Sequence, residues 1–361
     1  MAVNIFSTFG QTPSEVISLS KKLGAQTYAL AHPPVVLGFG GVGGRKESEG
    51  PLGRYFDYIS TDDTFGESTW EKAESAMQKQ ALTIALNRAG KTPPDLDFLL
   101  AGDLLNQCIG SAFAARGFGI PFLGLYGACS TMGESTALAS LLLDGGFGTL
   151  AGAVTSSHFC SAERQYRTPL EYGGQRTPTA QWTATASGAL VLSAREGHGP
   201  RVTHDTVGKV VDKGITDANN MGAAMAPSAY DTLSAHFRDT GRSPDFYDLI
   251  VTGDLGKLGH EIVLDLFRRD GMALSNYNDC GLLLFDLEKQ DVHCGGSGCG
   301  CSAAVLTTLL LPGLLAGKWK RILFCPTGAL LSPTSTQQGE SIPGVCHAIA
   351  LTAPGCEEVK G

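Results

Sequence analysis

Residues 90–104, GKTPPDLDFLLAGDL, recur as residues 241–255, GRSPDFYDLIVTGDL, and this repeat decides the fold. A glycine and a proline turn are typical of a helix end, and the apolar run after them is typical of a buried strand. Each copy therefore predicts a helix end, a turn, a strand and an acidic loop. The spacing indicates two fused copies of a unit of roughly 150 residues.

Further elements of the two copies follow the same order. A capping box at Ser68–Glu71 predicts a helix that ends at Gly90, and apolar residues at helical spacing predict its counterpart over 226–240. Downstream, the Cys-Ser pairs at 129–130 and 301–302 each precede a predicted buried helix (137–143 and 303–311) and a strand (150–155 and 321–327).

This alternation of strands and helices predicts the α/β class, with parallel sheets covered on both faces. Two halves related by pseudo-twofold symmetry would form five layers in the order α/β/α/β/α. We expect an N-terminal half over 21–197 and a C-terminal half over 198–361, with 1–20 as an N-terminal extension.

The composition excludes several classes of protein. The chain has 361 residues, of which 43% are hydrophobic and 17% charged, so it can bury a large core. A net charge of −8, without clustered Lys and Arg, argues against a nucleic-acid partner. The N-terminus does not resemble a signal peptide, so we expect the ten cysteines to be reduced and the protein cytoplasmic. The apolar stretch 303–316 is too short to span a bilayer.

Ligands in parallel sheets bind beyond the carboxyl ends of strands. Asp103, Cys129, His158, Asp254 and Ser297 are expected there, between the halves. Cys129 follows a glycine turn and precedes a helix, whose N-terminus would lower the pKa of the thiol and offer N–H groups to an anion. A buried structural cysteine is the alternative. Asp103 and Asp254 are either oxygen ligands or caps of their own loops.

Two other patterns carry less weight. Residues 38–43, GFGGVG, match a dinucleotide-binding pattern, but no convincing helix follows, so we expect a loop there. The spacing of His293, Cys294, Cys299 and Cys301 departs from that of structural zinc sites, so no metal site is predicted.

The two fused halves, with a cysteine at a strand-to-helix turn, resemble the thiolase superfamily. Residues 127–130, GACS, are similar to the nucleophile turn of its ketoacyl-synthase branch. Those enzymes also use a second-half histidine and asparagine, or two histidines. This chain has Gly253-Asp254 and the loop 295–298, GGSG, in the corresponding places, and only His293 lies nearby. Condensation would then lack most of its transition-state stabilisation.

A narrower resemblance is to the stage V sporulation protein AD family. The motifs that carry it are EGPLG (49–53), LAGDLLNQ (100–107), FLGLYGACST (122–131), TSSH (155–158), AERQ (162–165), EYGG (171–174), GITD (214–217), MGAAMAP (221–227), NDCG (278–281) and TGALLSP (327–333). This resemblance implies a thiolase-like protein that binds dipicolinic acid, pyridine-2,6-dicarboxylate, alone or as its calcium chelate, in its uptake or release during sporulation and germination. No other cofactor is expected.

The resemblance also implies a homodimer that is peripheral to the forespore or spore inner membrane and works with other membrane channel proteins of the same system. The alternative is a Cys129-dependent acyltransferase of the ketoacyl-synthase type. For dipicolinate binding, an arginine (Arg164, Arg167 or Arg176) would bind one of the ligand's carboxylates, and Tyr126 would stack on its pyridine ring. The candidate ligand-binding residues are Cys129, Ser130, Asp103, Asn106, His158, Arg164, Asp254 and Ser297.

Overall fold

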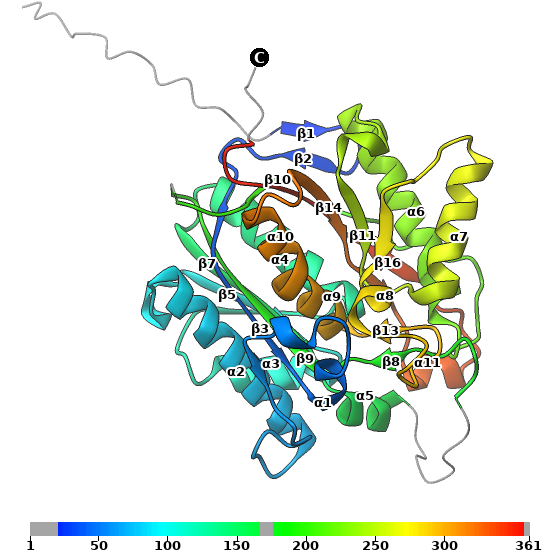
Figure 1. Ribbon diagram of the computed structural model, residues 1–361, viewed down its shortest axis with the longest axis horizontal. Helices are drawn as coiled ribbons and strands as arrows, with labels where there is room; N and C mark the ends of the chain where they lie inside the picture. Colours follow the sequence, from blue (N-terminus) through cyan, green and yellow to red (C-terminus); the bar gives the residue numbers. More distant parts are fainter. Residues whose placement is uncertain (1–20, 167–175, 196, 357–361) are drawn as a thin grey trace, which may run out of the picture.

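The computed structural model describes residues 21–166, 176–195 and 197–356, and these form a layered α/β body (Figure 1). The extension 1–20, the motif 171–174 and Arg167 lie outside the described residues. The strands are β1 (Lys21–Leu23), β2 (Thr27–Ala29), β3 (Val35–Gly43), β4 (Tyr58–Ile59), β5 (Phe98–Gly102), β6 (Phe122–Leu125), β7 (Leu150–Ser157), β8 (Trp182–Thr183), β9 (Ala186–Ser193), β10 (Arg201–Thr206), β11 (Leu249–Thr252), β12 (Tyr277–Asp279), β13 (Gly296–Ser297), β14 (Arg321–Cys325), β15 (Thr327–Ala329), β16 (Gly344–Cys346) and β17 (Ala348–Thr352).

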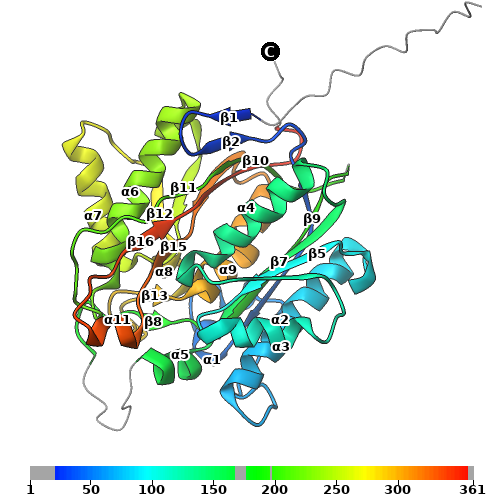
Figure 2. The same ribbon diagram turned by 180° about the vertical axis from the view of Figure 1, so that it is seen from behind.

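The helices are distributed over three layers around the strands. They are α1 (Arg45–Ser48), α2 (Trp70–Ala89), α3 (Ile109–Ala115), α4 (Thr131–Asp144), α5 (Phe159–Tyr166), α6 (Met221–Thr240), α7 (Gly256–Arg269), α8 (Cys280–Leu284), α9 (Cys299–Val305), α10 (Leu311–Leu315) and α11 (Pro333–Gln337). Helices α2 and α3 cover one outer face and α6 and α7 the other, while α4, α9 and α10 lie between the strands of the two halves (Figures 1 and 2). The five-layered arrangement is confirmed.

The strand order shows the internal symmetry directly. The first half is ordered β3-β9-β7-β5-β6 and the second β10-β17-β14-β11-β12, so each strand has a counterpart at the same place. The halves join where Arg201 of β10 pairs with Val35 of β3. Asp97 and Asp248, equivalent in the repeat, both accept hydrogen bonds from the backbone that leads into the neighbouring strand, β7 or β14.

The prediction of parallel sheets is wrong for two strands. In the first half β9 pairs antiparallel with β3 and β7, and in the second half β17 pairs antiparallel with β10 and β14. Both strands are buried along most of their length, on both faces. A strand buried on both faces reads as a continuous apolar run in either orientation, so its sequence does not report its direction.

The glycines of 38–43 lie in strand β3 and not in the predicted loop. They permit close packing on both faces of that strand. A Cβ on Gly38 would lie 2.2 Å from the Ala85 carbonyl oxygen of α2, and one on Gly41 would lie 2.6 Å from the hydroxyl of Thr307 in the central layer. Here glycine in a strand marks close approach of neighbouring elements.

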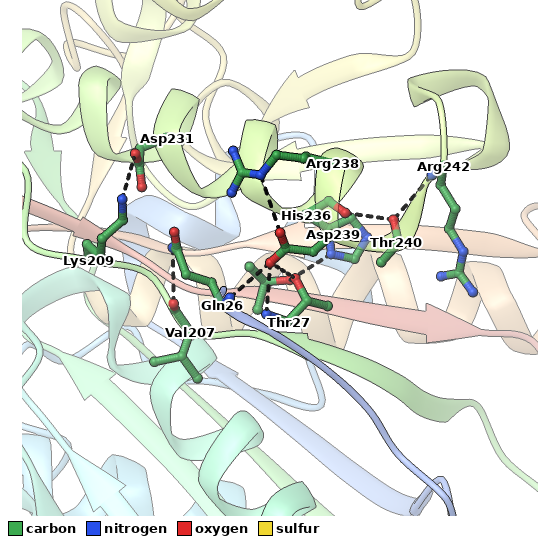
Figure 3. Close-up of polar contacts among 11 residues, drawn as sticks. Gln26, Thr27, Val207, Lys209, Asp231, His236, Arg238, Asp239, Thr240 and Arg242 are labelled. Carbon is green, nitrogen blue, oxygen red and sulfur yellow. Dashed lines mark hydrogen bonds and ion pairs between the residues drawn. The ribbon is translucent and has the colours of Figure 1, made fainter. Parts of the chain in front are cut away.

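The β1–β2 hairpin belongs structurally to the second half. Strand β2 pairs with β10, and Asp239 of α6 accepts hydrogen bonds from the backbone N–H of Gln26 (2.9 Å) and Thr27 (3.2 Å) and from the Thr27 hydroxyl (3.2 Å) (Figure 3). The boundaries 21–197 and 198–361 stay predictions.

All ten cysteines are free. Within the described residues, no helix is both long and apolar enough to cross a membrane.

We predict that Asp239→Ala loosens the hairpin. The Asp239 side chain is only 2% exposed, and its loss leaves the buried backbone donors of Gln26 and Thr27 unpaired, so the protein should lose about 2–3 kcal/mol of unfolding free energy. Hydrogen exchange over 21–29 should accelerate. The control is Lys209→Ala, which removes the exposed ion pair with Asp231 (Figure 3) and should change stability by less than about 1 kcal/mol. Unchanged exchange over 21–29 would contradict the assignment.

Candidate functional site

A cavity of about 270 Å³ lies where both halves meet, at the start of the central helix α4. Its walls come from the ends of strands, the starts of α4 and α6, and helix α5, so no single segment builds it. The lining residues are Leu104, Ala128, Cys129, Ala162, Glu163, Tyr166, Thr183, Ala218, Asn219, Met221, Ser297, Ala329 and Leu331. Most of this surface is apolar, with a few oxygen-bearing side chains, which is typical of a small-molecule site.

Cys129 lies at the base of this cavity, in a turn that holds it in place. The turn Ala128–Ser130 leads directly into α4, and the Ser130 hydroxyl donates to the Gly127 carbonyl oxygen (2.7 Å). Ala128 has φ of 52°, in the left-handed region that costs a non-glycine residue about 1 kcal/mol or more. Gly328 of β15 packs against the turn, where a Cβ would lie 2.5 Å from the Gly127 carbonyl oxygen.

The thiol of Cys129 lies beside the carboxylate of Asp254, the acidic residue of the second repeat copy, close enough for the two groups to interact electrostatically. Asp254 follows β11 and is fully buried. It also accepts hydrogen bonds from the Gly298 N–H (2.9 Å), the Thr327 hydroxyl (3.0 Å) and the Ser297 hydroxyl (3.2 Å). Three donors, from the loop before α9 and from β15, therefore converge on one carboxylate beneath the cavity, beside the Cys129 thiol.

Burial controls the ionisation of both groups. It raises the pKa of Asp254 to about 6, an effect that the hydrogen bonds partly offset. Burial, together with the negative charge of Asp254, raises the pKa of Cys129 well above its ordinary value. The prediction that the helix start lowers this pKa is wrong, because loss of hydration and a neighbouring carboxylate both disfavour the thiolate. At neutral pH the thiol is protonated.

Asp103, the repeat partner of Asp254, has a different environment. Its carboxylate accepts from the Ser111 N–H (2.7 Å), the Ser111 hydroxyl (2.6 Å) and the Leu105 N–H (2.9 Å), so it caps the start of α3 and its own loop. Burial raises its pKa. Buried Glu74 lies beside it, and burial with the nearby charge of Asp103 raises the pKa of Glu74 to about 8. Asp103 is not part of the cavity lining.

Of the other predicted residues, Ser297 lines the cavity, whereas Ser130, His158 and Asn106 are not among the lining residues. The hydroxyl of Ser130 is bonded within the turn. The His158 ring accepts from the Cys160 N–H and contacts the Asp63 carbonyl oxygen (2.7 Å), and burial lowers its pKa. The Asn106 amide oxygen accepts from the Tyr126 hydroxyl (3.3 Å).

The arginines and the remaining histidine are engaged elsewhere. Arg164 pairs with Glu71 and lies over the Trp70 ring, and Arg176 pairs with Asp291 (2.7 Å) and lies over Trp182. His293 contacts the Thr177 carbonyl oxygen (2.6 Å) and Asp291. None of these side chains, nor that of Tyr126, is among the residues that line the cavity.

Several lining residues were not foreseen. Glu163 and Tyr166 come from α5, Met221 from the first turn of α6, and Leu331 from the loop after β15. Tyr166 donates from its hydroxyl to the Leu104 carbonyl oxygen (2.7 Å), and burial raises its pKa. These positions lie in or next to three of the motifs that carry the family resemblance, 162–165, 221–227 and 327–333. Membership of such a motif was the sequence signal that could have identified them.

The fold and the cysteine turn define a thiolase-like protein. Among solved structures, 3-oxoacyl-[acyl-carrier-protein] synthase III from Aquifex aeolicus VF5 matches with a TM-score of 0.56 at 12% identity, covering 88% of this chain and 99% of that one. Cerulenin-bound OleA of Xanthomonas campestri matches with a TM-score of 0.57 at 14% identity, covering 89% and 96%. These two likenesses establish the fold alone.

The sequence comparisons are more specific. The model of the Stage V sporulation protein AD (SpoVAD) family matches residues 24–352. Stage V sporulation protein AD of Bacillus subtilis (strain 168) is 47% identical over 336 residues, which cover 93% of this chain and 99% of the relative. The chain belongs to the stage V sporulation protein AD family.

We predict that Asp254→Asn changes how stability depends on pH. The pKa of Asp254 in the folded protein, about 6, exceeds its ordinary 3.8, so its stabilisation is fully present below pH 3.8 and is lost as pH rises through 6. Relative to the variant, wild type should lose up to about 3 kcal/mol between pH 4 and 7, measured by urea unfolding.

Asp97→Asn is the control with the opposite sign. Backbone hydrogen bonds from Thr149 and Leu150 lower the pKa of Asp97, so its contribution is present above its ordinary pKa and is lost as pH falls. An Asp254→Asn difference that stays constant across the pH range would contradict the assignment.

Proposed function

We propose that this protein binds dipicolinic acid in the cavity at Cys129 without converting it, as part of dipicolinate uptake or release in sporulation and germination. The ligand comes from the family resemblance. The observation that supports binding without catalysis is the buried Cys129–Asp254 pair, because a nucleophilic cysteine needs a neighbour that stabilises its thiolate. The negative charge of a carboxylate beside the thiol does the opposite, because it disfavours the thiolate.

The position of Asp254 strengthens this argument. It belongs to the second repeat copy, on the segment where a condensing enzyme would need its histidine. Since Asp254 is acceptor-only when ionised, it cannot donate a hydrogen bond to a developing enolate or oxyanion. The site therefore retains a small-molecule cavity while the groups around its cysteine favour the neutral thiol.

The lining suits a small planar acid. A volume of about 270 Å³ lies near the lower end for ligand sites, and Leu104, Tyr166 and Leu331 offer apolar or aromatic contact to a ring. The oxygens of Glu163 and Asn219 are of the type that calcium prefers. We propose that the ligand enters as its calcium chelate, whose metal neutralises the carboxylates beside Glu163.

Calorimetry tests this proposal on the full chain. Dipicolinate with calcium should bind saturably, and more tightly than dipicolinate alone; isophthalate, which lacks the ring nitrogen, should bind weakly. Leu331→Trp narrows the cavity and should weaken binding about tenfold or more. Leu138→Trp, at an exposed position of α4 outside the lining, is the matched control and should bind as wild type does. Absence of saturable binding to folded wild type would refute the proposal.

The second candidate is an acyltransferase that uses Cys129, and the thiolase-like fold is the observation in its favour. Intact mass after incubation with acyl-CoA separates the two proposals. We expect no adduct on wild type at neutral pH; a stable adduct that Cys129→Ser abolishes would instead establish the enzyme.

We further propose a homodimer that associates peripherally with the spore inner membrane and its channel proteins. Strand β6 ends the strand order of the large sheet and exposes Leu123 and Gly124, so its edge can pair with the same edge of a second copy. Sedimentation velocity should show a dimer, and Leu123→Asp should shift it to monomer. A wild-type monomer at micromolar concentration would contradict this.

A further inference from the structure

The end of the molecule opposite the cavity carries an unusually placed aromatic side chain. Phe147 is 72% exposed, the highest value for a large apolar side chain within the described residues. It lies in the turn between α4 and β7, flanked by Gly145, Gly146 and Gly148. The turn is well ordered by hydrogen bonds from the Gly146 N–H to Leu143 (3.1 Å) and from the Phe147 N–H to Leu142 (3.0 Å). The backbone therefore presents the ring to solvent in a fixed position.

The pseudo-twofold symmetry places a second, equivalent turn after α10. The Gly317 N–H donates to Leu314 (3.2 Å) and the Lys318 N–H to Gly313 (2.9 Å), the same pattern as at Gly146 and Phe147. Just as Asp97 holds the end of the first turn, Asp248 holds the end of the second through the Lys320 N–H (2.6 Å). Lys318 thus occupies the position of Phe147.

Both turns lie at the same end of the molecule. Helix α4 and the helical run from α9 to α10 begin at the cavity, near Cys129 and Cys299, and lie together between the two sets of strands (Figures 1 and 2). Their C-terminal ends therefore point away from the cavity. We call the surface formed by Phe147, Arg195, Leu315, Lys318 and Lys320 the distal face.

The distal face combines exposed apolar side chains with three positive charges, and the exposed carboxylates of Asp97 and Asp248 lie beside the same two turns. Leu315 is 43% exposed, Lys318 lies 4.2 Å from the centre of the Trp319 ring, and both Lys318 and Lys320 are exposed. Exposed Arg195 adjoins the first turn, since the Ala194 N–H donates to Thr149 and Arg195 lowers the pKa of Asp97. Aromatic and aliphatic tips flanked by Lys and Arg are typical of side chains that anchor a protein in the headgroup layer of an anionic bilayer.

We propose that the distal face docks on an anionic lipid surface. The chain as a whole carries a net charge of −8, so an anionic membrane repels most of the molecule and attracts this patch. Phe147 and Leu315 enter the headgroup layer while Lys318, Lys320 and Arg195 contact lipid phosphates. This inference rests on the proposed peripheral location. It adds an orientation, with the cavity at the end of the molecule that faces away from the lipid.

Co-sedimentation with vesicles tests the proposal on the full chain. Wild type should bind vesicles of phosphatidylcholine mixed with phosphatidylglycerol, bind pure phosphatidylcholine vesicles far less, and lose binding as salt rises. Phe147→Ser, and separately Lys318→Glu with Lys320→Glu, should each reduce partitioning about tenfold. Tyr58→Ser removes another exposed aromatic (45% exposed) from β4, outside the distal face, and should bind as wild type does.

Each contrary outcome is informative. Equal binding of wild type and Phe147→Ser, or no binding of wild type to either vesicle, would overturn lipid docking. Binding only to native spore membranes, and not to protein-free vesicles, would overturn it in favour of a protein partner. Calorimetry with dipicolinate on the same variants keeps the two proposals apart, because distal-face substitutions should leave the cavity's affinity unchanged.

Discussion

The arrangement beneath the cavity depends on the buried carboxylate of Asp254. A charge taken out of water costs several kcal/mol unless its acceptor sites are filled, and here three donors accompany it. Those donors come from the loop before α9 and from strand β15, and the carboxylate also lies beside the cysteine turn. Because the two carboxylate oxygens of Asp254 require these donors at once, the segments that carry them hold fixed positions relative to one another. These segments form the floor of the cavity, so its shape is fixed as well.

Under the proposed function, the same carboxylate also keeps the site from condensation chemistry. In a thiolase-like body the start of the central helix already presents a cysteine and open N–H groups to a cavity. What that cysteine does then depends on the charge next to it. With Asp254 beside it the thiol keeps its proton, and under the proposed function the fold then serves ligand binding and not acyl transfer.

Much of the architecture could be predicted from the sequence because the repeat and the apolar runs report local structure. The direction of β9 could not, since a doubly buried strand has no polar face to mark it. Asp103 and Asp254 occupy equivalent sequence positions, yet Asp103 accepts hydrogen bonds from Ser111 and caps a loop, whereas Asp254 lies beside Cys129. Their difference arises from tertiary neighbours such as Ser297 and Thr327, which are distant in the sequence. The cavity lining could not be predicted from the sequence for the same reason, since α5, α6 and β15 come together only in the fold and each contributes only a few side chains.

The docking of the β1–β2 hairpin on the second half has a consequence for the order of folding. Thr27 is among the first described residues to be synthesised, yet its partners Thr206 and Asp239 follow 179 and 212 residues later. A contact of such sequence separation closes a long loop and forms slowly. During synthesis the hairpin therefore leaves the ribosome undocked, and it docks only when β10 and helix α6 of the second half arrive.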